Sequence, residues 1–224
     1  MNLIIKWHQY LALVVIAPLL IWLGTGLTLN LMDHSAASGN DHKVNLNQQQ
    51  VFVQGELKPV NFTQITTKPI LKIELIQLLS KPYYLLHHQL TAHNYFKSDK
   101  TLVNALTGNK INIDQQFAIA LAQRSYSGEA PPMTAQLLKS QVADLNKEQN
   151  WVWQVNFNDL NNTAVYIRAN SGEIIAHVND NKRFKNLMLR LHFMDFSNVG
   201  SFNNWQNILF ALLLFSLSVT GIIW

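Results

Sequence analysis

Histidine is the residue type in this sequence most able to hold a cofactor. The chain has eight histidines and no cysteine, which excludes disulfides, thiolate metal sites and cysteine nucleophiles. His8 lies at the start of a long apolar run, and His192 ends a segment with one charged and one apolar face. An ionisable residue at or within a membrane segment is by default a functional candidate.

Both positions also have a plain structural interpretation. Trp7, His8 and Tyr10 could anchor a helix at the level of the lipid headgroups. His192 could be a passive border residue of a helix that lies on anionic headgroups. The residues alone leave the two interpretations open.

The other histidines offer weaker signals. His87, His88 and His93 resemble a metal cluster only superficially, because adjacent strand residues point to opposite faces and no acidic partner lies nearby in the sequence. We expect a surface pair there, with at most a transient ferric-ion contact. No glycine-rich nucleotide loop, HExxH or GxSxG motif occurs in the chain.

Two uncharged apolar runs must position the candidate histidines. Leu11 to Leu31 and Trp205 to Trp224 are each long enough as helices to cross a hydrocarbon core of roughly 30 Å. The first run is too long for the apolar part of a signal peptide. We therefore predict transmembrane helices over residues 1–33 and 204–224.

A single α+β domain with antiparallel sheets is expected over residues 34–181. Its first part, to about Pro69, is polar and is predicted to be irregular, with edge strands such as Val51 to Val53. Pro131-Pro132 is expected to break the chain. Predicted helices are Ile70 to Leu79 and Asp114 to Arg124, and predicted strands are Tyr83 to Gln89, Asn94 to Lys97, Thr101 to Leu106, Trp151 to Asn158, Thr163 to Ala169 and Glu173 to Val178.

The glycine turns and two tryptophans of this domain allow further predictions. Similar glycine turns at Gly108 and Gly172 suggest a degenerate internal repeat, the alternative being two unrelated hairpins. Trp151 and Trp153 share one face of an alternating strand and are expected in the sheet core.

Residues 182–196 are predicted to contain an interfacial amphipathic helix. Phe184, Leu187, Met188 and Leu191 form its apolar face, and Lys182, Arg183, Lys185 and Arg190 form its charged face. The net charge of +4 is modest, and no basic stripe with interleaved aromatic residues suggests a nucleic-acid partner.

Short motifs at both ends and in the middle resemble the PepSY-associated transmembrane family. They are Trp7-His8 with Thr25-Gly26 in the first run, Leu191-His192 followed by Gly200, the closing Thr220-Gly221-Ile222-Ile223-Trp224, and a helix followed by strands with a glycine turn. The resemblance implies a PepSY-like periplasmic domain, a bacterial inner-membrane location and cytoplasmic termini. The positive-inside rule supports this orientation only weakly, through Lys6.

Members of this family include ferric and ferric-siderophore reductases that resemble b-type haem proteins, some with four spans in one chain. The resemblance implies haem b held by His8 and His192, since histidine and methionine are the common axial ligands in a chain without cysteine. Arg183 and Arg190 could pair with its propionates, although lipid phosphates are the commoner partner.

His8 and His192 are expected on opposite sides of the membrane, so that one iron cannot reach both. A homodimer would restore four helices and pair His8 with its mate, and His192 with its mate, His34 or Met194. The implied function is reduction of Fe(III), free or siderophore-bound, with electrons from quinol or a cytosolic reductase, because no flavin or nicotinamide domain fits before the first span. The alternative is a non-enzymatic anchored module that binds a peptide, a peptidase or a transporter.

Overall fold

The computed structural model describes residues 3–44, 57–139, 142–198, 200 and 203–223. It divides into two units, each described by itself below. The first comprises the two chain ends, Met1–Ala37 and Lys182–Trp224, and the second is Ser38–Asn181.

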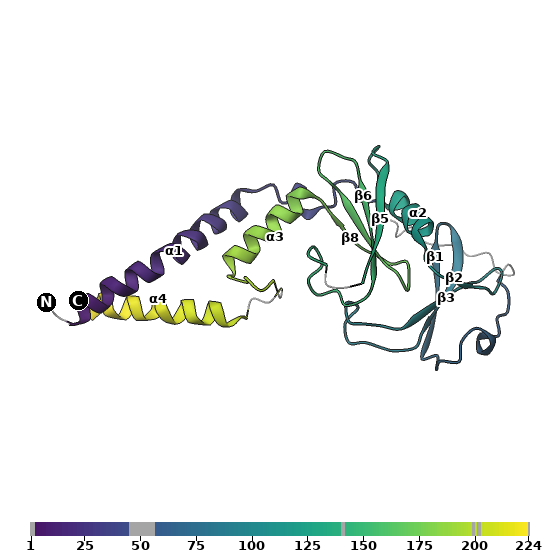
Figure 1. The fold of residues 1–224 in the computed structure, drawn as a ribbon, viewed down its shortest axis with the longest axis horizontal. Coiled ribbons are helices and arrows are strands. Elements are labelled where there is room, and N and C mark those ends of the chain that lie inside the picture. Colours follow the sequence, from purple (N-terminus) through teal and green to yellow (C-terminus); the bar gives the residue numbers. More distant parts are fainter. Residues whose placement is uncertain (1–2, 45–56, 140–141, 199, 201–202, 224) are drawn as a thin grey trace. The chain divides into compact units, whose positions relative to one another are not determined.

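The first unit contains the two long apolar helices, α1 (Leu3–Leu31) and α4 (Trp205–Ile223). Both are long and apolar enough to cross a membrane, and few of their residues are buried within the chain. Exposed apolar surface of this extent fits contact with lipid rather than a soluble core. The start of α1 and the end of α4 lie side by side (Figure 1), as a contact between His8 and Thr220 requires. The predicted pair of terminal apolar helices is confirmed and fits a two-pass membrane protein.

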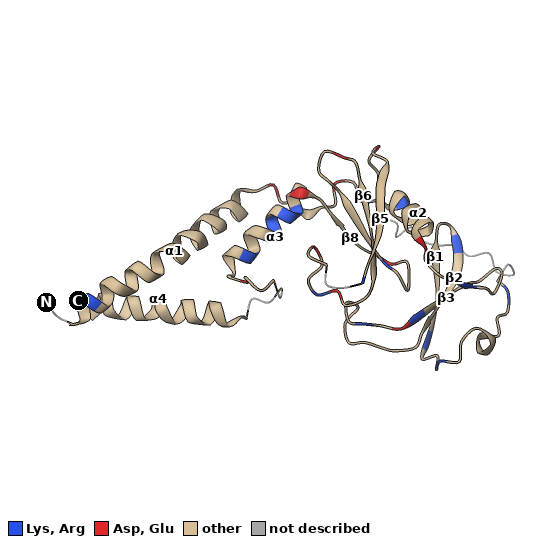
Figure 2. Ribbon diagram, in the orientation of Figure 1, with Lys and Arg blue, Asp and Glu red and all other residues tan. Residues whose placement is uncertain are grey.

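α3 (Asp180–His192) differs from the two long helices in its content of charged residues. Basic residues follow one another along α3, whereas α4 has none and α1 has only Lys6 near its start (Figure 2). The helix ends at His192, and Met194 and Asn198 after it adopt a positive φ. The helical prediction for this segment is confirmed, while its contact with lipid headgroups stays a prediction.

The second unit contains two four-stranded antiparallel sheets with the strand orders β1-β2-β3-β4 and β5-β6-β7-β8. α2 (Gln115–Ser125) follows the first sheet, and its N-cap Asp114 accepts a bond from the Phe117 amide at 2.8 Å. Strand bounds are β1 Lys72–Leu78, β2 Lys81–His87, β3 Lys100–Asn104, β4 Lys110–Ile111, β5 Pro132–Leu138, β6 Val152–Phe157, β7 Ala164–Arg168 and β8 Ile174–Val178.

One core joins both sheets to α2. Leu85 and Leu102 of the first sheet, Leu121 of α2, and Val155 and Ile167 of the second sheet belong to the same buried cluster. Each sheet is a meander whose last hairpin turns at a glycine with positive φ, 79° at Gly108 and 72° at Gly172. The two halves therefore share a topology, as the suspected repeat requires.

Several sequence predictions within this unit are wrong. Ile70 to Leu79 forms β1 instead of a helix, because its apolar residues also fit alternation and pairing with β2 decides between the two. Asn94 to Lys97 is a turn whose aromatic rings pack on one another. Pro131-Pro132 does not break the chain, since Pro132 is the first residue of the edge strand β5, a position that tolerates proline. The expected strand at Val51 to Val53 lies outside the described residues.

The tryptophan prediction holds for one residue of the two. Trp153 packs partly buried against the core and donates from Nε1 to the Ile113 carbonyl at 3.0 Å. Trp151 precedes β6 and is 52% exposed, with the Lys139 Nζ 5.0 Å from its ring centre. Strand alternation cannot place a residue that lies before the strand begins.

Candidate functional site

Each candidate histidine of the membrane unit contacts a threonine-glycine pair on another helix. His8 near the start of α1 places Nδ1 3.0 Å from the Thr220 Oγ1 of α4, although 212 residues separate them. We call Thr220 and Gly221 the His8 seat.

The second contact repeats the first at the other level of α1. His192 at the end of α3 places Nδ1 3.2 Å from the Thr25 Oγ1 and 3.1 Å from the Trp22 carbonyl oxygen. Its ring also stacks on the Trp22 indole, with ring centres 5.2 Å apart and planes inclined by 16°. We call Thr25 and Gly26 the His192 seat.

A carbonyl next to Nδ1 assigns the tautomer of His192. The Trp22 carbonyl has no proton to donate, so Nδ1 of His192 donates to it and Nε2 carries the lone pair. The Thr25 hydroxyl, which bonds back to the Ile21 and Trp22 carbonyls, can accept from the same Nδ1. Thr220 bonds back to its own helix in the same way beside His8 Nδ1. A lone pair on Nε2 is the form of histidine that binds a metal.

Glycine in each seat lets the imidazole lie against the helix. A Cβ on Gly221 would be 3.1 Å from the His8 Cε1, and one on Gly26 would be 3.1 Å from the His192 Cε1. These distances are tighter than ordinary van der Waals contact, so a side chain at either position would push the ring outward. The Thr-Gly pair thus combines a hydroxyl beside Nδ1 with room for the ring.

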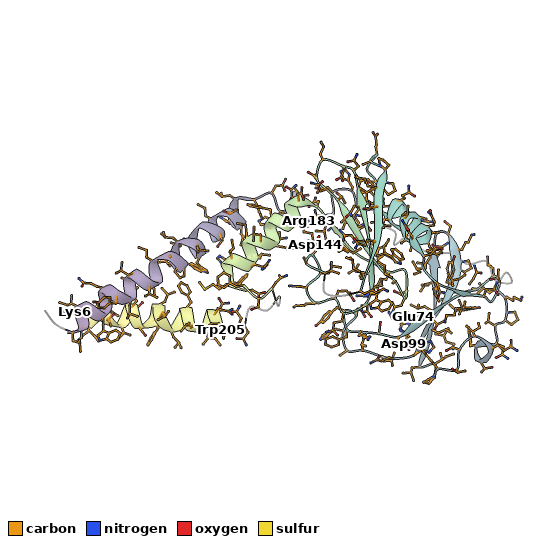
Figure 3. All side chains as sticks on the ribbon, viewed as in Figure 1. Lys6, Glu74, Asp99, Asp144, Arg183 and Trp205 are labelled. Carbon is orange, nitrogen blue, oxygen red and sulfur yellow. The ribbon has the colours of Figure 1, made fainter. Side chains whose placement is uncertain are left out.

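The two contacts lie at different levels of α1, because His8 is near its start and Thr25 is near its end. Along α1, 1.5 Å per residue separates His8 from Thr25 by roughly 25 Å. Lys6 marks one end of this unit, and Trp205, at the start of α4, lies toward the other (Figure 3). The two histidines are therefore too far apart to contact one common metal ion.

Of the remaining predicted site residues, Arg183 and Arg190 lie on α3, Met194 lies just after it, and His34 lies just after α1. Arg190 Nε is buried and has no hydrogen-bond partner among the described residues, and Arg183 lies two turns earlier on the same helix. Met194 is buried, with 6% of its surface exposed. His34 is exposed in the turn after α1. The structure thus places Met194, two residues from His192, in a more protected setting than His34.

His87 and His88 of the sheet unit bond to neighbouring segments of that unit. His88 uses both ring nitrogens, with Nδ1 2.9 Å from the Pro69 carbonyl and Nε2 2.9 Å from the Thr101 Oγ1. His87 Nε2 lies 2.9 Å from Glu74, an acidic partner that pairing of β1 with β2 supplies and that the sequence order hides. Both are buried, so the expected surface pair is wrong. Within the described ranges, no group of three or more His, Asp or Glu side chains could hold a metal ion.

In the sequence, two apolar helices flank a domain of two antiparallel sheets. The chain is therefore of the class of membrane-anchored proteins with a two-sheet domain. The chain belongs to the family described as the PepSY-associated TM region, which matches residues 2–224. No curated protein and no solved structure matches it at the threshold applied.

The sequence motifs include the threonine-glycine pairs of both seats but do not show which histidine each pair contacts. Thr25-Gly26 and Thr220-Gly221 were recognised as family signatures, yet their role as contacts for His192 and His8 follows only from the packing of helices far apart in the chain.

Proposed function

We propose that this protein is a haem-binding ferric reductase of a bacterial inner membrane, with both termini cytoplasmic and the sheet domain periplasmic. It would pass electrons from quinol or a cytosolic reductase to Fe(III), free or siderophore-bound, and supply Fe(II) for uptake. The observation that carries the proposal is the duplicated seat, in which Nδ1 of a histidine on one helix lies beside the hydroxyl of a threonine on another.

The residues of the seats fit the requirements of an axial haem ligand. A ligating histidine usually donates its second ring nitrogen to an acceptor that fixes its tautomer and orientation. Thr220 and Thr25 can serve as such acceptors for His8 and His192, and the Trp22 carbonyl reinforces the second. Haem b would supply one-electron redox chemistry, which no protein side chain of this chain provides.

Charge near the His192 level also supports this proposal. The Arg190 guanidinium carries a buried Nε with no hydrogen-bond partner in the described part of the chain. A carboxylate such as a haem propionate would satisfy that donor with a charge-assisted bond. Arg183 lies on the same face of α3 and would serve a second carboxylate or a lipid phosphate.

A second ligand for each iron must come from elsewhere, because one chain offers one seated histidine per level. A homodimer would bring two copies of His8 together at one level and two copies of His192 at the other. Met194 would be the alternative partner at the His192 level.

The test is the visible spectrum of the full-length protein purified in detergent after expression with ample haem supply. Oxidised and dithionite-reduced spectra are compared for wild type, His8→Ala and His192→Ala, with the exposed His93→Ala as the matched control. We expect a b-type spectrum in wild type and control, and loss of about half the haem in each seat variant because two levels bind independently.

Retention of the remaining haem shows that a seat variant is still folded. The same samples are then assayed for reduction of Fe(III) with a ferrous chelator. Colourless wild-type protein would contradict the proposal and leave the non-enzymatic binding module as the surviving function.

A further inference from the structure

The first strand of the sheet unit is a long, regular sheet edge. β1 pairs with β2 at every position from Lys72 to Leu78 without a register shift. In the described part of the chain, no strand pairs with its other side. Natural proteins usually protect such edges with proline, bulges, very short strands or charged side chains, and β1 has only the last of these, Lys72 and Glu74.

The other three edges of the two sheets carry these protections. β4 has two residues, β5 begins with Pro132 and shifts register after it, and the pairing of β8 with β7 also shifts register. β1 is therefore the long regular edge, and its composition indicates what it pairs with.

Three apolar side chains follow one another on the outer face of β1. Leu71, Ile73 and Leu75 alternate along the chain and are 56%, 47% and 37% exposed. Inward-facing residues of the same strand, such as Ile76 and Leu78, pack against the core. The outer face thus carries an apolar row that the chain itself leaves exposed.

We propose that β1 pairs antiparallel with β1 of a second copy, about a twofold axis at Ile73. In this register, Ile73 faces itself and Leu71 faces Leu75 of the second copy, so that all three exposed apolar residues are matched on one face. On the other face, Lys72 and Glu74 form an ion pair within each chain. In this register each would also lie opposite its oppositely charged counterpart of the second copy, which would extend the pair into an alternating network of four charges.

Alternative registers are poorer by the same criteria. An axis at Lys72 or at Glu74 would set like charges opposite each other. An axis at Leu75 would set Ile73 opposite Gln77 and leave Lys72 opposite an apolar residue. The charge pattern therefore selects the axis at Ile73.

The backbone orientation fits this register. In β2, the Pro82 carbonyl accepts from the Ala105 amide and so points to β3. Because successive residues alternate, His87 points instead to β1, where it faces Lys72 as a hydrogen-bonded pair. Ile73, next along β1, therefore points its amide and carbonyl to the open edge, where it would form a hydrogen-bonded pair with its mate, with Cα atoms about 5.5 Å apart.

A pair of seven-residue strands buries less than the standard interface of about 1,600 Å². Anchoring by α1 and α4 offsets this deficit, because two copies in one membrane meet at a raised effective concentration. The proposal is independent of haem binding and concerns the sheet unit alone.

The experiment uses the absence of native cysteine. Full-length Ile73→Cys, Leu75→Cys and Leu71→Cys are reconstituted in lipid nanodiscs large enough for two copies and oxidised mildly. Ile73→Cys is expected to form a disulfide-linked dimer at least about tenfold faster than either other variant alone, because only residue 73 meets its own mate within disulfide range. Leu75 and its mate would be roughly 13 Å apart along the strands.

A mixture of Leu71→Cys and Leu75→Cys copies provides the matched control for register, because it should cross-link as fast as Ile73→Cys. Equal rates for all single variants would indicate random collision, and absence of dimer with Ile73→Cys would mean that another partner or none covers β1. Either result would overturn the proposal.

Charge reversal checks the register without cysteine. Lys72→Glu is expected to lower the cross-linking rate of Ile73→Cys severalfold by repulsion from Glu74 of the second copy, and added Glu74→Lys should restore it. A rate unaffected by Lys72→Glu would contradict the proposed charge pairing. The spectrum of bound haem should not change in any of these variants.

Discussion

His88 of the sheet unit and His192 of the membrane unit have similar partners but use their ring nitrogens differently. His88 bonds the Pro69 carbonyl through Nδ1 and the Thr101 hydroxyl through Nε2. His192 bonds the Trp22 carbonyl and the Thr25 hydroxyl through Nδ1 alone. The first arrangement occupies both nitrogens, whereas the second fits the ligand role that we propose for His192.

The two units also differ in whether they bury charged side chains. The sheet unit buries Arg168 between Glu148 and Glu173, with Arg168 Nη2 2.7 Å from a Glu148 oxygen. Burial alone would lower the pKa of Arg168, but its bonds to the two carboxylates raise it above the ordinary value. Burial also lowers the pKa of the nearby Lys100. By contrast, α4 carries no charged side chain. The sheet unit therefore buries an ion pair whose loss would leave an unpaired charge, whereas α4 has no charge to pair.

The largest effect is expected from breaking the buried ion pair of the sheet unit. Arg168→Met would leave Glu148 buried without its cation and reduce the free energy of unfolding by about 3–5 kcal/mol. Thermal unfolding of the full chain in detergent, followed by near-UV circular dichroism, measures the change. Arg124→Met, at an exposed position, is the control and should unfold like wild type.

Two glycine substitutions compare the units directly. Gly172→Ala should destabilise the sheet unit by roughly 1–3 kcal/mol, because residue 172 has a φ of 72° and its Cβ would be 2.8 Å from the Leu78 Cδ1. Gly26→Ala should leave that unit's unfolding unchanged and displace only the His192 ring. Equal loss of sheet stability in both variants would contradict the separation of the units.

Removing one seat hydroxyl should have a smaller effect. Thr220→Val is expected to cost about 1 kcal/mol of helix association and to reduce the fraction of His8 in the Nδ1–H form. The ¹⁵N shifts of the imidazole in haem-free protein report this fraction. Thr28→Val is the matched control, since Thr28 also donates to a carbonyl of its own helix, that of Gly24. An unchanged His8 tautomer in Thr220→Val would remove the basis for the seat.

The smallest effect concerns a pH-dependent pair in the sheet unit. Burial, and then the bond from its hydroxyl to Asp159, raise the pKa of Tyr126 to about 12. Because folding favours the neutral phenol, the associated stability is complete below pH 10 and is lost as the pH rises toward 12. Burial also raises the pKa of Tyr83. Alkaline titration of tyrosinate absorbance should therefore show late-titrating groups, one of which disappears in Tyr126→Phe.

The Tyr126–Asp159 pair also predicts that stability decreases at acidic pH. Burial would raise the pKa of Asp159, but bonds from Thr163 and Tyr126 outweigh it and lower the pKa. Its contribution is therefore present at neutral pH and is lost as the pH falls through the lowered pKa. Asp159→Asn should flatten the acid dependence of stability, and an unchanged acid profile would show that another carboxyl dominates.

Local pattern was sufficient for much of this protein. The sequence by itself determined the two apolar helices, the capped helix that Asp114 begins, and the glycine turns at Gly108 and Gly172, because length, hydropathy, capping and positive φ are properties of short segments. It also singled out His8 and His192, whose positions beside apolar runs are visible without a structure.

Only the tertiary structure decided the features that depend on distant partners. Residues 72–78 form a strand because they pair with β2. The same pairing brings Glu74 next to His87, which gives that buried histidine a hydrogen-bond partner. His8 meets Thr220 across 212 residues, and His192 meets Thr25 across 167. No local pattern encodes these contacts, since the energy that selects them comes from packing and hydrogen bonds formed only when the segments meet.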